Sequence, residues 1–100
     1  MEKRMKNYSD GLFLLKLIKH RIEEGATFFE KLNLDTRDRF SQNALYWAIY
    51  LERVEDVTLL LKHNVSREVA PNLDAFSYAL EVNNPEIIEL FGMKEMAISA

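Results

Sequence analysis

The residues able to transfer protons or bind a metal ion are few and scattered. The two histidines, His20 and His63, are far apart and fit no metal-binding spacing such as HExxH. Adjacent acids occur as Glu23–Glu24 and Glu55–Asp56, but consecutive helix positions do not face each other, so neither pair is expected to form an acid–base site. There is no Gly-rich phosphate loop and no GxSxG motif. We therefore expect no catalytic residue, no cofactor and no metal.

The composition is that of one small globular domain spanning residues 1–100. Hydrophobic residues make up 48% of the chain and charged residues 29%, which is typical of folded proteins. The net charge is −3. One modest basic face, Lys16 to Arg21, is weak evidence for nucleic-acid binding, so no nucleic-acid partner is expected.

Cysteine is absent, so disulfides and thiolate metal sites are excluded and a reducing compartment is favoured. No apolar run approaches the roughly 18 residues of a membrane span. We expect a cytoplasmic protein with no membrane partner; delivery into a host cell stays open.

Capping and breaker residues divide the chain into short helices that must position any site. Ser9 or Asp10 is predicted to cap the first helix and Gly25 to end it. A short second helix is expected around Phe28 and Phe29. No segment alternates as a strand would, which predicts an all-α fold.

The stretch from Asn43 to Asn64 contains two helix-sized apolar patterns in close succession. Asn43 is predicted to cap the first helix. The chain turns around Leu51 to Arg53, and the second helix runs from about Val54 to His63. Asn64 occupies a position that suits a left-handed helix end. These residues predict a tight helix hairpin.

A second hairpin follows with the same signals. Asp74 is predicted to cap its first helix, Asn83–Asn84 to turn the chain, and Pro85 to open its last helix. Residues of the first hairpin match residues of the second at one constant offset in sequence number, which we call the repeat separation. The matched pairs are Asn43 and Asp74, Leu45 and Phe76, Ala48 and Ala79, Glu55 and Glu86, Val57 and Ile88, and Leu60 and Phe91. A constant separation indicates an internal repeat.

The repeat resembles the ankyrin family, whose period is about 33 residues of turn and two helices. Residues 38–66 look like one near-complete repeat, with Asn43-Ala44-Leu45-Tyr46 in the place of the family's Thr-Pro-Leu-His. Glu52 stands where glycine is usual, so we expect another turn shape there, because a left-handed glutamate costs about 1 kcal/mol.

This resemblance implies a short ankyrin-like α-solenoid of stacked antiparallel helix hairpins. Its expected parts are an N-terminal helical pair at 10–34, repeats at 35–66 and 67–93, and a tail at 94–100.

By the same resemblance, the chain is expected to bind another protein, as an adaptor, inhibitor or effector. The contact surface is implied to be the turn tips and the exposed side of each first helix. The implied partner-binding residues are Arg39, Phe40, Gln42, Tyr50, Leu51, Leu73, Glu81 and Val82. Tyr46 and Trp47 are interpreted as packing residues between helices.

The alternative is a self-assembling protein that uses an apolar C-terminal face. The last helix has more apolar residues than one buried side needs, and terminal repeats normally have a polar outer face. Three explanations stay open: a tail that folds back as a cap, a continuation of the array, or a homodimer through Ile88, Phe91 and Met93.

Overall fold

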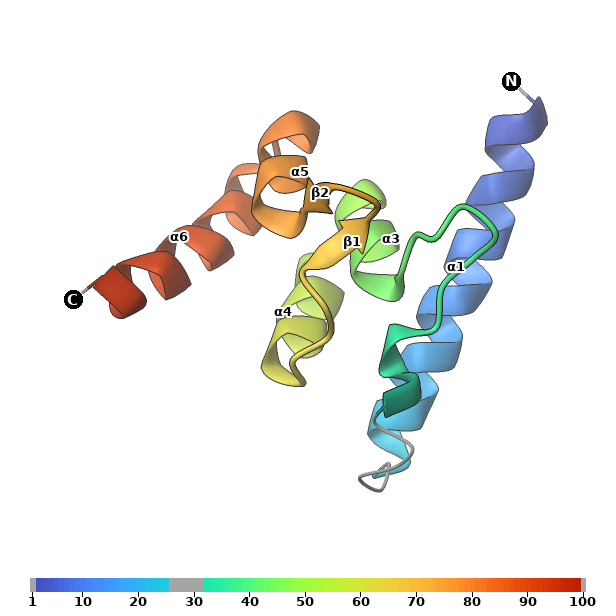
Figure 1. Ribbon diagram of the computed structural model, residues 1–100, viewed down its shortest axis with the longest axis horizontal. Coiled ribbons are helices and arrows are strands. Elements are labelled where there is room, and N and C mark those ends of the chain that lie inside the picture. Colours follow the sequence, from blue (N-terminus) through green and yellow to red (C-terminus); the bar gives the residue numbers. More distant parts are fainter. Residues whose placement is uncertain (1, 26–31, 100) are drawn as a thin grey trace.

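The structure, a computed structural model, describes residues 2–25 and 32–99, with side chains for 9–25 and 34–92. These residues form five α-helices, one 3-10 turn and a two-stranded antiparallel sheet. The helices lie across the molecule in sequence order, from α1 (Glu2–Glu23) at one edge to α6 (Pro85–Ser99) at the other (Figure 1). The fold is mostly helical, as predicted, with a small sheet that was not predicted.

Helix α1 is longer than its sequence signals suggested. Ser9 and Asp10 lie inside it, so the prediction that one of them caps the helix was wrong. The preceding residues are mostly Glu, Lys, Arg and Met, which favour helix strongly enough to extend it. Gly25 ends the helix as predicted, with φ of +70° and its N–H donating to the Ile22 carbonyl.

The second helix predicted around Phe28 and Phe29 falls outside the described residues. The chain resumes as the 3-10 turn η1 (Leu32–Asp35), which packs on α1 and buries Leu34.

Helices α3 (Ala44–Tyr50) and α4 (Val54–Lys62) form the predicted first hairpin. Asn43 caps α3 by accepting a hydrogen bond from the Tyr46 N–H at 3.0 Å. Asn64 ends α4 with φ of +59°. The expectation of another turn shape at Glu52 was wrong: its φ is +56°. The Glu52 carboxylate accepts a hydrogen bond from Asn84 at 2.9 Å.

A short antiparallel hairpin, β1 (Glu68–Ala70) and β2 (Leu73–Asp74), links the two helix pairs. It turns through Asn72, whose φ is +59°. Strands this short cannot show a period of two, so pattern reading missed them.

The second helix pair consists of α5 (Ala75–Val82) and α6. Asp74 caps α5 through the Phe76 N–H at 2.9 Å, as predicted. Asn84 caps α6 by accepting from the N–H groups of Glu86 and Ile87 at 3.0 and 3.3 Å. The α6 backbone stays helical to Ser99, so residues 94–99 continue the helix instead of folding back.

The two hairpins pack side by side, α3 on α5 and α4 on α6, and α1 packs on the opposite side of α3. Residues that lie one repeat separation apart also share unusual backbone conformations. Ser41 and Asn72 are left-handed at +61° and +59°, and Glu52 and Asn83 at +56° and +62°. Both hairpins therefore have the same backbone plan.

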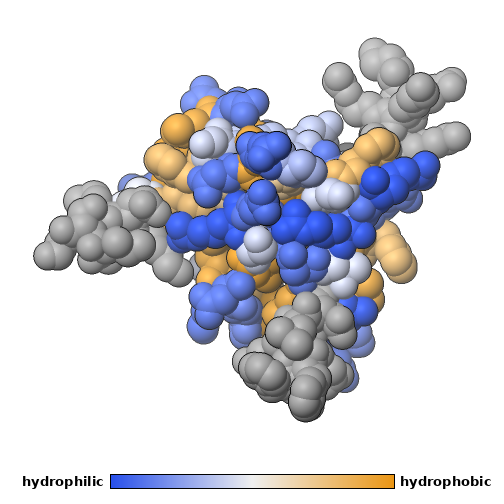
Figure 2. Space-filling view, viewed as in Figure 1, coloured by the Kyte–Doolittle hydropathy of each residue, from blue (hydrophilic) through white to orange (hydrophobic). Residues whose placement is uncertain are grey.

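The core runs through all of these layers. Its largest fully buried side chains include Leu15, Ile18, Leu45, Ile49, Leu60, Ile87 and Phe91. On the face seen in Figure 2, hydrophilic residues form a band across the centre, and hydrophobic patches lie on both sides of it. Within the described ranges, no helix combines the length and apolar character needed to cross a membrane.

Candidate functional site

The tip loop, residues 38–42, is held in one conformation by its own hydrogen bonds. The Asp38 carboxylate accepts from the backbone N–H of Phe40 at 2.8 Å and of Gln42 at 3.0 Å. The Asp38 N–H donates to the Gln42 carbonyl, and the Ser41 N–H donates to the Asp38 carbonyl. Because its backbone groups are paired locally, the loop presents its side chains in a preformed arrangement.

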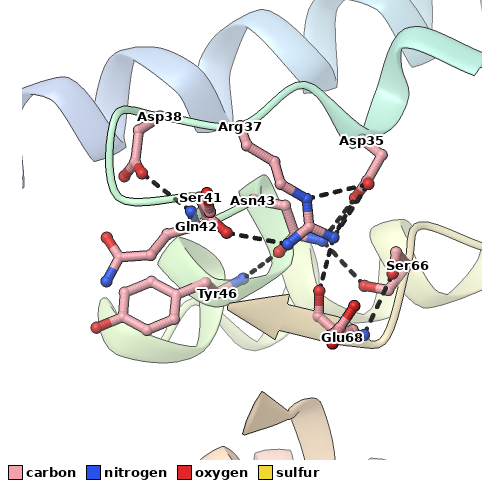
Figure 3. Close-up of polar contacts among 9 residues, drawn as sticks. All are labelled: Asp35, Arg37, Asp38, Ser41, Gln42, Asn43, Tyr46, Ser66 and Glu68. Carbon is pink, nitrogen blue, oxygen red and sulfur yellow. Dashed lines mark hydrogen bonds and ion pairs between the residues drawn. The ribbon is translucent and has the colours of Figure 1, made fainter. Parts of the chain in front are cut away.

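Arg37 connects this loop to η1 and to the β-hairpin (Figure 3). Its guanidinium donates to both oxygens of Asp35 at 3.1 Å. It also donates to the Ser41 carbonyl at 2.9 Å and to the Glu68 carbonyl at 2.7 Å. A planar guanidinium has enough donors in a fixed fork to hold three segments together.

Asn43 also joins separate segments of the chain through hydrogen bonds. Its side chain is fully buried, and its amide donates to Asp35 at 3.0 Å and to the Ser66 carbonyl at 2.9 Å (Figure 3). Its side-chain oxygen is occupied by the cap of α3. Every polar group of this buried side chain thus has a partner, which burial requires.

Trp47 is bonded to the tip loop from the buried side of the loop. Its indole Nε1–H donates to the Asp38 carboxylate at 2.9 Å, and only 3% of the residue is exposed. The ring lies against α1 at Gly11, where an added Cβ would come within 2.0 Å of the indole. The interpretation of Trp47 as a packing residue is confirmed.

Arg39 and Phe40 of the tip loop face solvent. Phe40 is 50% exposed, and the Arg39 guanidinium carbon lies 5.9 Å from the centre of its ring. Arg39 also approaches Asp10 of α1 at 3.4 Å, an exposed ion pair that contributes little to stability. Aromatic and arginine side chains are enriched at protein interfaces and among the residues that contribute most to binding.

Three tyrosines form a row across α3 and α5, which we call the tyrosine row: Tyr50, Tyr46 and Tyr78. The Tyr46 ring is nearly parallel to that of Tyr78, with centres 4.5 Å apart, and to that of Tyr50, with centres 6.4 Å apart. All three are partly exposed. Burial, followed by a hydrogen bond with Tyr46, raises the pKa of Tyr78 well above its ordinary value.

The eight predicted partner-binding residues are all at least partly exposed. They fall into groups at the tip loop (Arg39, Phe40, Gln42), the strand before α5 (Leu73), the end of α3 (Tyr50, Leu51) and the end of α5 (Glu81, Val82).

Sequence reasoning missed the tyrosine row. It assigned Tyr46 to packing and did not select Tyr78. Tyr46 lies four positions before Tyr50, and Tyr78 lies three before Glu81. Such spacings place side chains on one helix face, so both tyrosines could have been selected from their spacing to a predicted contact residue.

A separate polar cluster lies where α1 meets α4. Asp56 is 6% exposed, with one oxygen 2.9 Å from the Lys19 ammonium and the other bonded to Arg53. Burial opposes ionisation, but hydrogen bonds from Lys19 and Arg53 outweigh it and lower the Asp56 pKa below 3.8. A shallow depression of about 270 Å³ is lined by residues 53–56. A carboxylate ionised at neutral pH with both oxygens paired is poorly suited to proton transfer, so this cluster joins two helices.

Within the described residues, no group of three or more His, Cys, Asp or Glu side chains could hold a metal ion. No family model, curated protein or solved structure matches the chain. The tip loop and the tyrosine row are therefore the two features of the molecule that indicate a function.

Proposed function

We propose that the chain is a protein-binding module that performs no chemistry of its own. Its contact surface is the tip loop together with the tyrosine row. The observation that carries the proposal is the exposed pair of Phe40 and Arg39 on a loop held by Asp38. A preformed surface loses little conformational entropy on binding, and aromatic and arginine side chains supply the strongest interface anchors.

We extend the proposal to an ankyrin-like solenoid. It is supported by the repeat separation, which the left-handed positions also keep, and by the packing of α3 on α5 and α4 on α6. In that family the turn tips and first helices form the binding surface, and the partner-binding residues are assigned here by that likeness. A cytoplasmic location belongs to the same proposal, and it is supported by the lack of cysteine.

The test is a comparison of two double variants. Phe40→Ala with Tyr50→Ala removes two anchors of the proposed surface. Phe13→Ala with Leu80→Ala removes two exposed apolar side chains that lie outside the proposed surface. Each protein would be immobilised, and the proteins that it captures from the source organism would be quantified by mass spectrometry. Each variant would then be titrated with the purified partner.

We expect the Phe40 and Tyr50 double variant to weaken binding at least about tenfold, because truncating one hot spot costs more than about 1 kcal/mol. The control variant should bind as the wild type does. Circular dichroism checks that both variants keep their helix content. A partner that binds the first variant normally, or is lost only from the control, would contradict the proposed surface.

A further inference from the structure

Ser41 of the tip loop has a backbone conformation that its side chain does not favour. Its φ is +61°, in the left-handed region where a residue that has a Cβ is strained. Its counterpart in the second hairpin, Asn72, has the same conformation at +59°, but asparagine occurs there several-fold more often than most residues. Such strain persists only where the surroundings fix the residue, so Ser41 needs contacts that hold it.

Arg37 supplies such a contact. Its guanidinium donates to the carbonyl of Ser41 itself at 2.9 Å. The residue that corresponds to Arg37 in the second hairpin is Glu68, and a carboxylate has no N–H or O–H to donate. The hairpin with the less favourable residue at the left-handed position is therefore the one that has the arginine.

Asp35 and Asn43 fix the direction of this guanidinium (Figure 3). Both Asp35 oxygens accept hydrogen bonds from Arg37 at 3.1 Å, a bidentate pairing that sets the plane of the guanidinium. One of these oxygens also accepts from the Asn43 amide at 3.0 Å, and Asn43 is fully buried. The exposed tip loop is thus connected to the interior through three side chains.

The same guanidinium also reaches the next hairpin. It donates to the Glu68 carbonyl at 2.7 Å, at the start of β1. Beside this bond, the Asn43 N–H donates to the Val69 carbonyl. Helix α5 directly follows the β-hairpin and carries Tyr78. Arg37 therefore ties the tip loop to the part of the chain that contributes Tyr78 to the tyrosine row.

We propose that Arg37 is a positioning residue of the binding surface. It holds Ser41 in the left-handed conformation, which sets the directions of Phe40 and Arg39 before a partner arrives. The inference rests on the proposed function, because it concerns how these two anchors are presented. Without the guanidinium, the loop samples other conformations, and a partner has to restrict them on binding, which lowers affinity.

The first experiment needs no partner. The N–H groups of Phe40, Ser41 and Gln42 are bonded within the loop, and NMR would follow their hydrogen exchange in wild type and in Arg37→Met. Methionine keeps an apolar stem but has no donor. We expect these amides to exchange at least about tenfold faster in the variant, because hydrogen bonds from a charged group shift a local opening equilibrium by that much. The slowest core amides, which report global unfolding, should accelerate by a smaller factor.

Two further variants separate positioning from a general loss of stability. Arg39→Met removes the neighbouring arginine, whose side chain pairs with Asp10 of α1, and should leave loop exchange unchanged. This control concerns exchange only, since Arg39 belongs to the proposed contact surface. Ser41→Asn copies the residue at Asn72. Added to Arg37→Met, it should restore most of the slow loop exchange, because asparagine tolerates the left-handed conformation.

The second experiment titrates the purified partner that the wild type captures. Arg37→Met should bind it several-fold more weakly, and Arg37→Met with Ser41→Asn should regain most of the affinity. Phe40→Ala with Tyr50→Ala would be measured in the same series. Circular dichroism checks that every variant keeps its helix content.

Three results would overturn the positioning role. The first is loop exchange in Arg37→Met that equals that of the wild type. The second is a loss in Arg37→Met that Ser41→Asn does not reverse. The third is a partner that Arg37→Met binds normally but the Phe40 and Tyr50 double variant does not, which leaves the proposed function standing. A partner that the double variant binds normally would instead overturn the proposed function, and loop exchange would still decide whether Arg37 holds the loop.

Discussion

The hairpins α3–α4 and α5–α6 share a backbone plan but differ in environment. Ile49 of the first hairpin is completely buried, whereas its counterpart in the second, Leu80, is 49% exposed. The first hairpin has a neighbour on each side, and the second packs on the first. An apolar residue at a given position of this repeat is therefore buried only where another element covers it.

The hairpins also differ in how they are held. Asp56 of α4 forms ion pairs with Lys19 of α1 and with Arg53, while its counterpart Ile87 is an apolar core residue. Helix α6 has a side-chain cap from Asn84, whereas no side-chain hydrogen bond caps α4 at Arg53. The middle hairpin therefore depends on contacts with α1, and the last hairpin depends more on its own caps.

The largest expected difference between the two hairpins comes from truncating the matched apolar residues Ile49 and Leu80. Ile49→Ala should lower the free energy of unfolding by about 2–5 kcal/mol, because it opens a cavity in the core. Leu80→Ala should cost less than about 1 kcal/mol, since much of that side chain is already in water. Urea unfolding of each variant at low protein concentration measures both. Equal losses would show that the hairpins have the same environment.

The matched helix caps should differ as well. Asn43→Ala removes the cap and leaves Asp35 and the Ser66 carbonyl without the Asn43 amide, so we expect a loss of about 2–3 kcal/mol. Asp74→Ala removes an exposed cap and should cost about 1 kcal/mol. Thermal and urea unfolding would measure the two losses. A larger loss for Asp74→Ala would contradict the buried role of Asn43.

Two helical glycines provide a smaller contrast. Gly92→Ala meets no atom within 4 Å and should stabilise the protein by about 0.5–1 kcal/mol through helix propensity. Gly11→Ala gains the same propensity, but its Cβ would overlap the Trp47 ring, and overpacking costs about 1–3 kcal/mol. We expect a net loss and a change in tryptophan fluorescence for Gly11→Ala alone. Stabilisation by both substitutions would mean that α1 does not pack tightly on α3.

The ion pairs of Asp56 should give the middle hairpin an acid-sensitive contribution. Because the folded-state pKa is lowered, the contribution is complete above the unfolded pKa of about 3.9 and disappears as pH falls through the folded pKa. Asp56→Asn should therefore destabilise the protein at pH 7, and its difference from wild type should shrink on acidification. Urea unfolding from neutral to acid pH measures this. A difference that does not change with pH would show that the Asp56 charge contributes nothing.

Local signals were enough to predict much of this fold. The caps at Asn43 and Asp74, the helix ends at Gly25 and Asn64, and the start of α6 all depend on interactions within a few residues. The same signals misplaced the start of α1, because a capping residue can also lie inside a helix when strong helix formers precede it.

The predicted partner-binding residues are exposed in the structure, but their sequence positions did not reveal how the site is built. The tip loop depends on Arg37 reaching Glu68 and on Trp47 reaching Asp38. The tyrosine row depends on Tyr46 meeting Tyr78 of the next hairpin. Such pairs come together only when separate segments pack, so spacing within one helix cannot specify them.

Most of the helices, the caps at Asn43 and Asp74 and the repeat separation follow from the sequence alone, because each depends on residues that are neighbours along the chain or recur in a pattern. Only the tertiary structure decided the β-hairpin, the ion pairs of Asp56 and the exposure of Leu80. Strand pairing, burial and partner distance depend on which surfaces meet in space. Matched positions in two hairpins consequently became buried core in one and open surface in the other.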